Sequence, residues 1–243
     1  MASIPRGALS RGFEILEFFR RRRRPARLKD VVAALGYPTS TTADLLKELA
    51  GAGYLTFHTS TRTYFPTPAV ATLGDWIVGS GSGHLDALAI ARRLNDATGE
   101  LIFVGTENGL HVQYLEALRS RHPVQYVVEP GTKRFLVKSG MGWALLAQED
   151  DSRVERTLRR TLSTAAGQAD QPPALLDLLA HMAAIRQHGY AFSRNLLYKG
   201  ASVVAAALPC EPRARRFAIG IAGPTDRIED QLGEYAALLL RMD

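Results

Sequence analysis

Apolar side chains in the first quarter of the chain recur at the three- to four-residue spacing of amphipathic helices. The pattern covers residues 9–19, 28–35 and 40–52 and predicts three short helices. Two runs rich in aromatic and β-branched residues follow at 54–57 and 63–66, and the polar residues between them favour a β-hairpin. Three helices followed by a hairpin is the order of a winged helix-turn-helix, whose third helix can enter the major groove of DNA.

Single residues indicate the ends and faces of these helices. Ser10 and Ser40 are candidate N-caps of the first and third helices, and Gly36 is placed to end the second. The leucines of the third helix form an apolar face that we expect to pack on the first two helices. The face expected to point outward consists of Thr39, Thr41, Thr42, Ala43, Asp44 and Lys47.

Residues 67–83 have the composition of a connection between two domains. A helical stretch that starts with a proline is followed by GSGSG at 79–83, which is typical of a flexible joint. We therefore expect a DNA-binding domain at 1–66, a linker helix and joint at 67–83, and a second domain at 84–243.

The second domain mixes helical and strand patterns, which predicts an α+β fold around a largely antiparallel sheet. Helices are expected at 85–97, 140–147, 151–162, 173–188 and 226–241. Strands are expected at 101–106, 110–118, 123–128, 202–208 and 217–222.

Composition narrows the class of protein. The chain has 243 residues, 46% of them hydrophobic, which suffices for one large domain or two modest ones. The single cysteine, Cys210, cannot form an internal disulfide, and no Cys/His group has zinc-ligand spacing, so we expect no metal and no other cofactor. No apolar run is long enough to cross a bilayer and no signal peptide is recognisable, which predicts a cytoplasmic protein that has no membrane partner.

The positive charge is concentrated at one end of the chain. Residues 1–68 contain 11 Lys or Arg and 5 Asp or Glu, a net charge of +6, whereas the remaining 175 residues carry 19 of each sign. This asymmetry indicates that the first domain meets a polyanion. A solvated basic face is the alternative.

Four sequence stretches, in a fixed order, carry a family resemblance. They are GYPTSTTADLL at 36–46 with AGYL at 52–55, GMGWALLA at 140–147, GYA at 189–191 and GIAGP at 220–224. Together they resemble the IclR (isocitrate lyase regulator) family of bacterial transcription factors over nearly the whole chain. The resemblance implies a winged helix-turn-helix, a linker helix and a C-terminal GAF-like effector domain. It also implies a homodimer or homotetramer that binds a pseudo-palindromic, double-stranded DNA operator and responds to a small-molecule effector.

By this resemblance the third helix and the wing, residues 57–64, face DNA. Asp44 departs from the basic or hydrogen-bonding residue usual in the family, so either it accepts from a cytosine amino group or the affinity comes from elsewhere. The arginine run at 20–24 lies where a winged helix commonly contacts phosphate. The alternative is that the run is a solvated, disordered loop. For the cluster at 39–42, the alternative to a DNA contact is capping of the third helix. The expected DNA contacts are Arg23, Arg24, Arg27, Thr39, Ser40, Thr41, Asp44, Lys47 and Arg62.

The resemblance also implies an effector cleft between a glycine-rich helix start and the C-terminal strands. Positions that often carry Asp, Cys and two Ser in the family are here Ser193, Val203, Gly220 and Ala222, which favours a larger, less polar effector such as an aromatic acid. Backbone N–H groups at 139–142 can hold its carboxylate. The alternative is a tightly packed sheet with no cavity. The expected effector contacts are Tyr126, Ser139, Gly140, Met141, Ser193, Ala201, Val203, Gly220 and Ala222.

No set of residues assembles an enzyme active site. The histidines are scattered, the GSGSG run lacks the lysine of a phosphate-binding loop, and Cys210 is best interpreted as a packed thiol. We therefore expect a regulator and not an enzyme. A DNA-binding protein whose second domain only oligomerises is the alternative, and an exposed Trp143 would serve such a subunit contact.

Overall fold

The computed structural model describes residues 7–74, 84–164, 173–209 and 215–242. The chain divides into two compact units, residues 1–80 and 81–243, and each has its own hydrophobic core. The division falls inside the segment expected to connect two domains. In that segment the helix α4 spans Ala69–Thr72, and the GSGSG run lies outside the described residues.

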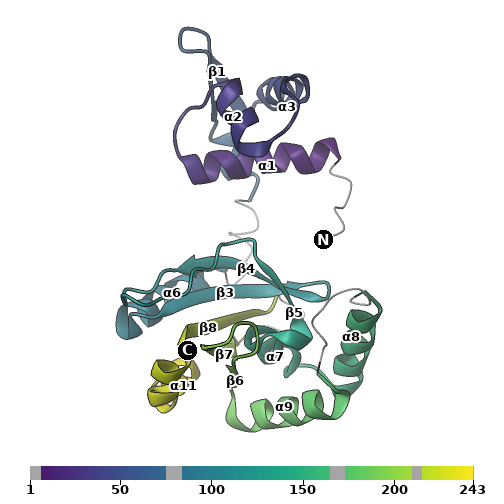
Figure 1. The fold of residues 1–243 in the computed structure, drawn as a ribbon, viewed down its shortest axis with the longest axis vertical. Helices are drawn as coiled ribbons and strands as arrows, with labels where there is room; N and C mark the ends of the chain where they lie inside the picture. The colour runs from purple at the N-terminus through teal and green to yellow at the C-terminus, as the bar shows by residue number, and fades with distance from the viewer. Residues whose placement is uncertain (1–6, 75–83, 165–172, 210–214, 243) are drawn as a thin grey trace. The chain divides into compact units, whose positions relative to one another are not determined.

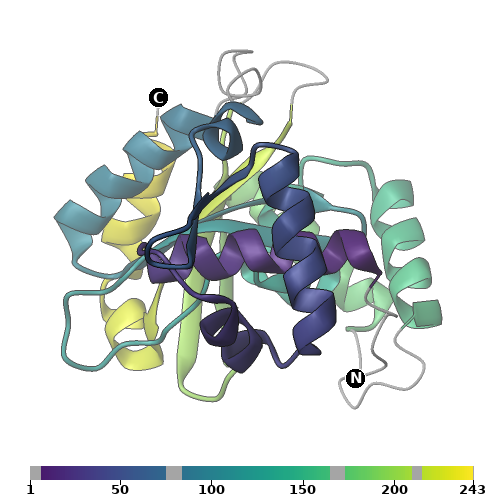
Figure 2. The same cartoon turned by 90° about the horizontal axis from the view of Figure 1, so that it is seen from above.

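The first unit has the predicted order of three helices and a hairpin (Figure 1). Helix α3 crosses α1 steeply, and their contact buries Ile15, Phe19, Leu45 and Leu46 (Figure 2). Because these side chains recur at helical spacing, one face of each helix is removed from water. The elements are α1 (Ala8–Arg22), α2 (Leu28–Leu35), α3 (Thr39–Gly51), β1 (Leu55–His58) and β2 (Thr63–Pro66).

The helix ends differ from the sequence prediction. Helix α1 continues into the arginine run and ends at Arg22, and the next residue, Arg23, has a left-handed φ of 51°. Neither predicted serine is a cap, because Gly7 precedes α1 and Pro38 precedes α3. Thr42, expected to face outward, is fully buried, and its hydroxyl donates to the Pro38 carbonyl.

The second unit is an α+β fold around a six-stranded antiparallel sheet with strand order β5-β4-β3-β8-β7-β6. The strands are β3 (Leu101–Asn108), β4 (His111–Leu118), β5 (Lys133–Phe135), β6 (Ala191–Arg194), β7 (Ala201–Ala207) and β8 (Phe217–Pro224). The helices are α6 (His84–Thr98), α7 (Gly140–Leu146), α8 (Asp151–Thr164), α9 (Leu175–His188), α10 (Thr225–Asp230) and α11 (Leu232–Leu240).

Helices cover both faces of this sheet (Figure 1). Ile102 and Val104 of β3 face α6, α10 and α11, while Leu101 and Phe103 face α7, α8 and α9. This alternation follows from the two-residue period of a strand. The two cores therefore share one sheet, and the cavity described below lies on the α7 face.

Four sequence predictions for the second unit are wrong or incomplete. Residues 123–128 form no strand, because this segment leaves the sheet after β4. The short strands β5 and β6 carry too few residues to show an alternating pattern, so both were missed. The predicted last helix is two helices that meet at Gln231, and Trp143 is buried, with 5% of its surface exposed. The Trp143 indole donates to the Val137 carbonyl at 2.9 Å, so it offers no exposed subunit contact.

Candidate functional site

The outer surface of α3 carries the polar residues expected to meet DNA. Thr39, Ser40, Asp44 and Lys47 are exposed, and Thr41 is half-buried. Their helical spacing presents Ser40, Asp44 and Lys47 on one side of the helix, while Leu45 and Leu46 anchor the other side in the core. A rigid helix with a polar outer face can enter a major groove.

The arginines after α1 are not a free loop. Arg22 lies 3.2 Å from the Asp30 carboxylate and over the Phe18 ring, so its charge is partly neutralised within the unit. Ala26, which follows Pro25, is fully buried and pairs with Tyr64 of β2 through two backbone hydrogen bonds of 3.0 and 2.8 Å. This bridge fixes the turn against the wing.

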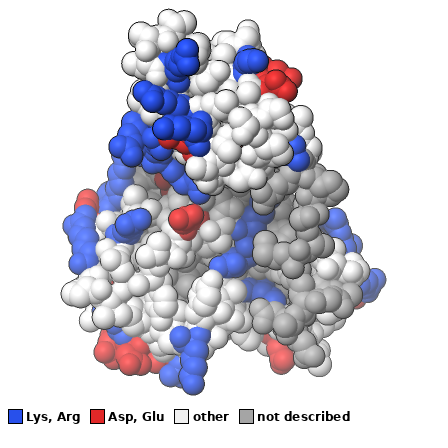
Figure 3. All heavy atoms as spheres, turned by 45° about the horizontal axis from the view of Figure 1, so that its top comes forward, with Lys and Arg blue, Asp and Glu red and all other residues white. Residues whose placement is uncertain are grey.

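Arg23, Arg24 and Arg27 therefore project from an anchored backbone. All three are exposed, and no described acidic residue forms an ion pair with any of them. Arg62 is exposed in the turn between β1 and β2, with a left-handed φ of 53°. Lys and Arg atoms gather over part of this unit in the upper region of Figure 3. The unit thus combines a groove-sized helix with cations free to contact phosphate.

The second unit contains a cavity of about 440 Å³ on the α7 face of its sheet. Its lining includes residues of two loops, 119–132 and 195–200. Val127 and Tyr198 of these loops expose 62% and 54% of their surfaces, so we take the loops as the rim of the cavity. Predicted residues among its walls are Tyr126, Ser139, Gly140, Met141, Ser193, Ala201, Val203 and Ala222. Further wall residues are Leu101, Phe103, Tyr114, Val127, Val128, Arg134, Leu196, Leu197, Tyr198, Lys199 and Ser202.

Gly220 is the predicted residue that does not line the cavity. A Cβ atom at this position would lie 2.6 Å from the Phe103 ring and 2.9 Å from the Met141 sulfur. The space is thus filled by these two side chains, which themselves form cavity wall. Because residue 220 has no side chain, Phe103 and Met141 can pack closely against its backbone. The glycine therefore does not itself enlarge the cavity.

Most of the wall is apolar, and its charged groups are all cationic. The charged lining residues are Arg134 and Lys199, and no described acidic residue lines the cavity. Tyr114 stacks on Phe103 with ring centroids 4.8 Å apart. Burial raises the pKa of Tyr114 to about 12, although the nearby Arg134 charge opposes this shift, so the phenol stays neutral at physiological pH.

The inner end of the cavity holds neutral hydrogen-bonding groups. The Ser139 hydroxyl caps α7 by accepting from the Gly142 N–H at 3.0 Å, which leaves the N–H groups of Gly140 and Met141 without an acceptor among the described residues. The Ser193 side chain, with 4% of its surface exposed, reaches toward Gly140, where a Cβ atom would lie 2.7 Å from its hydroxyl oxygen. Of the four N–H groups expected to be free at 139–142, that of Gly142 is therefore already bonded.

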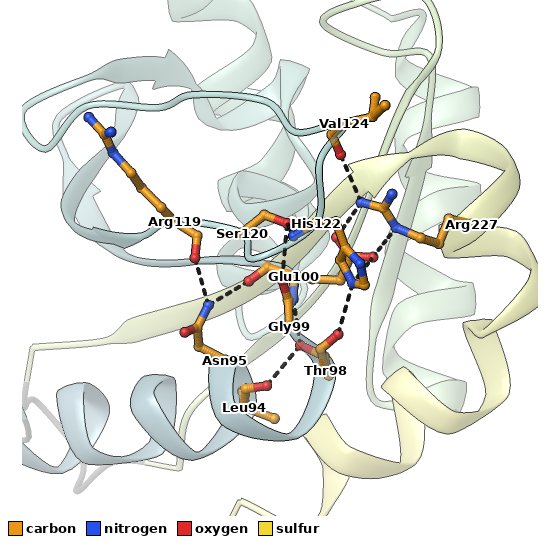
Figure 4. Close-up of polar contacts among 10 residues, drawn as sticks. All are labelled: Leu94, Asn95, Thr98, Gly99, Glu100, Arg119, Ser120, His122, Val124 and Arg227. Carbon is orange, nitrogen blue, oxygen red and sulfur yellow. Dashed lines mark hydrogen bonds and ion pairs between the residues drawn. The ribbon is translucent and has the colours of Figure 1, made fainter.

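A cluster of polar contacts anchors the 119–132 loop (Figure 4). Glu100 is fully buried and accepts from Arg227, whose Nη2 lies 2.8 Å from Oε2 and also 3.2 Å from the Val124 carbonyl. Asn95 of α6 donates to the backbone carbonyls of Glu100 and Arg119, at 2.7 and 3.0 Å. These contacts fix the base of the loop that carries Tyr126 to the cavity.

The part of the chain that the structure describes offers neither a metal site nor a membrane-spanning helix. There, no group of three His, Cys, Asp or Glu side chains is placed to hold a metal ion. No described helix is both long and apolar enough to cross a membrane. Cys210 lies outside the described residues.

Sequence reasoning missed several wall residues. Alternation along the β3 and β4 patterns could have placed Phe103 and Tyr114 on one face of the sheet. Arg134 lies on the unpredicted β5, and residues 196–199 lie in a loop without a pattern, so no local signal pointed to them.

Two family models match the chain. The IclR helix-turn-helix domain matches residues 8–58, and the model described as bacterial transcriptional regulator IclR C-terminal matches residues 86–242. Among curated relatives, the transcriptional repressor IclR of Escherichia coli is 26% identical over 96% of this chain and 86% of its own length. The HTH-type transcriptional regulator BhcR of Paracoccus denitrificans is 28% identical over 84% of this chain and 72% of its own length.

Solved structures share the fold. IclR of Thermotoga maritima superposes with a TM-score of 0.71 at 17% identity, covering 96% of this chain and 94% of that one. An IclR regulator from Alicyclobacillus acidocaldarius gives a TM-score of 0.69 at 20% identity, covering 99% and 96%. These similarities confirm the predicted arrangement of a helix-turn-helix unit and an α+β unit.

Proposed function

Because this chain belongs to the IclR family of bacterial transcriptional regulators, we propose that it is a ligand-responsive regulator of the following kind. It binds a pseudo-palindromic operator as a homodimer or homotetramer in the cytoplasm, and a small organic acid with an apolar or aromatic body controls that binding. The observation that carries this proposal is an apolar cavity, with no acidic residue among its described walls, in the second unit of a helix-turn-helix protein. Such a cavity suits a ligand that combines an apolar body with a negative charge.

The DNA half of the proposal is supported by the anchored cations of the first unit. Arg23, Arg24 and Arg27 surround a turn fixed to the wing by the Ala26–Tyr64 bridge, and Arg62 lies in the wing itself. We assign these four residues to phosphate contacts, which supply affinity. Thr39, Ser40, Thr41, Asp44 and Lys47 on α3 are assigned to the groove, where base edges are read.

An exposed apolar stripe on α1 supports self-association. Leu9 and Phe13 lie one helical turn apart and expose 76% and 58% of their surfaces. A second copy that packs the same stripe against it would form a two-fold contact, which matches a palindromic operator. Dimerisation through α1 would place two α3 helices for adjacent half-sites.

The ligand half is supported by the size and chemistry of the cavity. A volume of about 440 Å³ lies in the lower part of the range usual for small-molecule sites. Val203 and Ala222 face each other across the β7–β8 pair and provide apolar wall where a polar wall would suit a small oxoacid. A larger apolar or aromatic acid fits better than glyoxylate or pyruvate, which can bury little apolar surface.

A direct experiment selects operators from random duplexes with the purified protein. We expect an inverted-repeat sequence to be enriched, and fluorescence anisotropy on that sequence should change when an aromatic acid such as benzoate or phenylacetate is added. Failure to enrich any duplex in low salt would refute the DNA half. Operator binding that no organic acid alters, together with calorimetry that detects no binding, would favour the alternative in which the second unit only oligomerises.

A further inference from the structure

We propose that Arg134, on the edge strand β5, holds the carboxylate of the effector at the mouth of the cavity, while the apolar body of the effector points inward. This inference rests on the proposed function and specifies how the ligand lies in the site. It places the negative charge of the ligand beside β5 and the 195–200 loop, and not at the start of α7.

Charge in the second unit supports this assignment. Arginines outside the cavity often pair with acids, as Arg153 does with Glu107, Arg186 with Asp151 and Arg227 with Glu100. Arg134 forms no ion pair with any described residue, yet it lines the cavity wall. A half-buried guanidinium without an acid, bordering an apolar hollow, favours an anionic ligand.

The position of Arg134 is fixed on both sides. Arg134 pairs with Val112 across the β4–β5 ladder, so both side chains lie on the same face of the sheet as Tyr114. From the rim, Tyr198 accepts a 2.7 Å hydrogen bond from Nη2, and its ring lies 5.8 Å from the guanidinium carbon. Because one contact already orients the side chain, less rotamer entropy is lost when a ligand binds the remaining donors.

The inner end of the cavity offers no described cation to a full negative charge. Its groups are neutral: the hydroxyl of Ser193, and the N–H groups of Gly140 and Met141. A carboxylate buried there would lose its hydration without gaining a cation. At the mouth, the ligand carboxylate keeps part of its hydration and gains Arg134, with Lys199 nearby on the same rim. The inner groups instead suit a hydroxyl or carbonyl on the far end of the ligand.

The geometry also suits a carboxylate with an aromatic body. A guanidinium presents parallel N–H donors that match the two oxygens of a carboxylate. The neutral Tyr114 phenol, whose pKa lies far above neutrality, adds an O–H donor on the same wall. The ring pair formed by Phe103 and Tyr114 provides a flat surface for an aromatic body.

The test compares matched probes and matched variants of the full chain by calorimetry. The probes are phenylacetate and 3-phenylpropionate, each with its neutral amide. The variants are Arg134→Met, Arg134→Lys and Lys133→Met. Lys133→Met is the matched control, because it removes the same charge from an exposed residue of the same strand that does not line the cavity. Thermal unfolding of each variant establishes that it is folded.

We expect the acids to bind the unaltered protein, with affinity reduced about 10- to 100-fold by Arg134→Met, as for loss of a charged hydrogen bond. Arg134→Lys should fall between, and Lys133→Met should have little effect. The amides should bind weakly and be indifferent to Arg134→Met. Ser193→Ala should affect acids and amides equally, because it alters the inner end.

Three results would overturn the assignment. The first is equal loss of acid binding in Arg134→Met and Lys133→Met. The second is a loss in Ser193→Ala that is specific to the acids, which would place the carboxylate at the inner end. The third is no binding of any probe acid to the unaltered protein. Operator binding measured on the same samples separates these outcomes from failure of the proposed function, because DNA binding can persist when the ligand assignment fails.

Discussion

The buried pair of Glu100 and Arg227 allows a quantitative prediction. Glu100 is fully buried, and Arg227 is the cation whose guanidinium contacts both of its carboxylate oxygens (Figure 4). Arg227→Met would remove the guanidinium charge and leave Glu100 with His122, whose Nε2 lies 3.6 Å from Oε1. Breaking a buried pair in this way costs about 3–5 kcal/mol, because the remaining charge is desolvated without compensation. For a unit of this size, that corresponds to a fall in melting temperature of roughly 6–20 °C.

Urea unfolding followed by Trp143 fluorescence measures this loss. A Trp76→Phe background leaves Trp143, which is buried in the second unit, as the sole tryptophan. The matched control is Arg121→Met, because Arg121 pairs with Asp96 on the surface, where the two side chains are 58% and 69% exposed. An exposed pair contributes at most about 1 kcal/mol.

A double-mutant cycle identifies the cause. Adding Glu100→Gln to Arg227→Met removes the stranded charge and should recover part of the stability. If Arg227→Met cost no more than Arg121→Met, or if Glu100→Gln deepened the loss, the pair would not be the anchor that the contacts indicate.

Three further predictions concern the DNA surface and the cavity. Replacing Arg23 and Arg24 together with Ala should make the plot of log K for DNA binding against log salt less steep by about 3.6 in a dimer, at 0.9 per phosphate contact. The control pair, Arg92→Ala with Arg93→Ala, is exposed on α6 and should leave the slope unchanged. Gly140→Ala would place a Cβ atom 2.7 Å from the Ser193 hydroxyl oxygen, so it should weaken binding of phenylacetate about tenfold, and Ser193→Gly in the same chain should restore it. Gly142→Ala would place a Cβ atom 2.2 Å from the Leu136 carbonyl oxygen, a backbone atom that cannot move aside. Urea unfolding should therefore show a free energy of unfolding lower by about 3 kcal/mol or more. Unchanged stability would mean that α7 packs more loosely than this contact implies.

The sequence predicted those elements whose side chains repeat over several turns or strand positions. Helix α2 and the β1–β2 hairpin have bounds close to those expected, because Val31 and Leu55 sit in patterns that pack locally. The start of α7 at Gly140 was expected from the helical pattern, and the family resemblance added only its place in an effector cleft. A second group of features was missed. The buried Thr42 hydroxyl donates to the Pro38 carbonyl four residues earlier, which satisfies a side chain whose polarity favoured the outer face, and the three-residue β5 is defined by its pairing with β4. Arg134, the residue to which we assign the ligand charge, belongs to this second group.

One physical criterion links the two candidate sites. A long cationic side chain free in solvent loses rotamer entropy when it binds an anion, so an unpaired cation on an anchored backbone gives more net binding energy. Arg24 and Arg27 flank the residue that bridges to the wing, and Arg134 is held by Tyr198. Arg22 and Arg227 are equally well held, but each is already neutralised by an acid, Asp30 and Glu100 respectively. An arginine that is held in place and lacks an acid partner is therefore a better indicator of a ligand than net charge, which is +6 for residues 1–68 and zero for the part of the chain that contains the cavity.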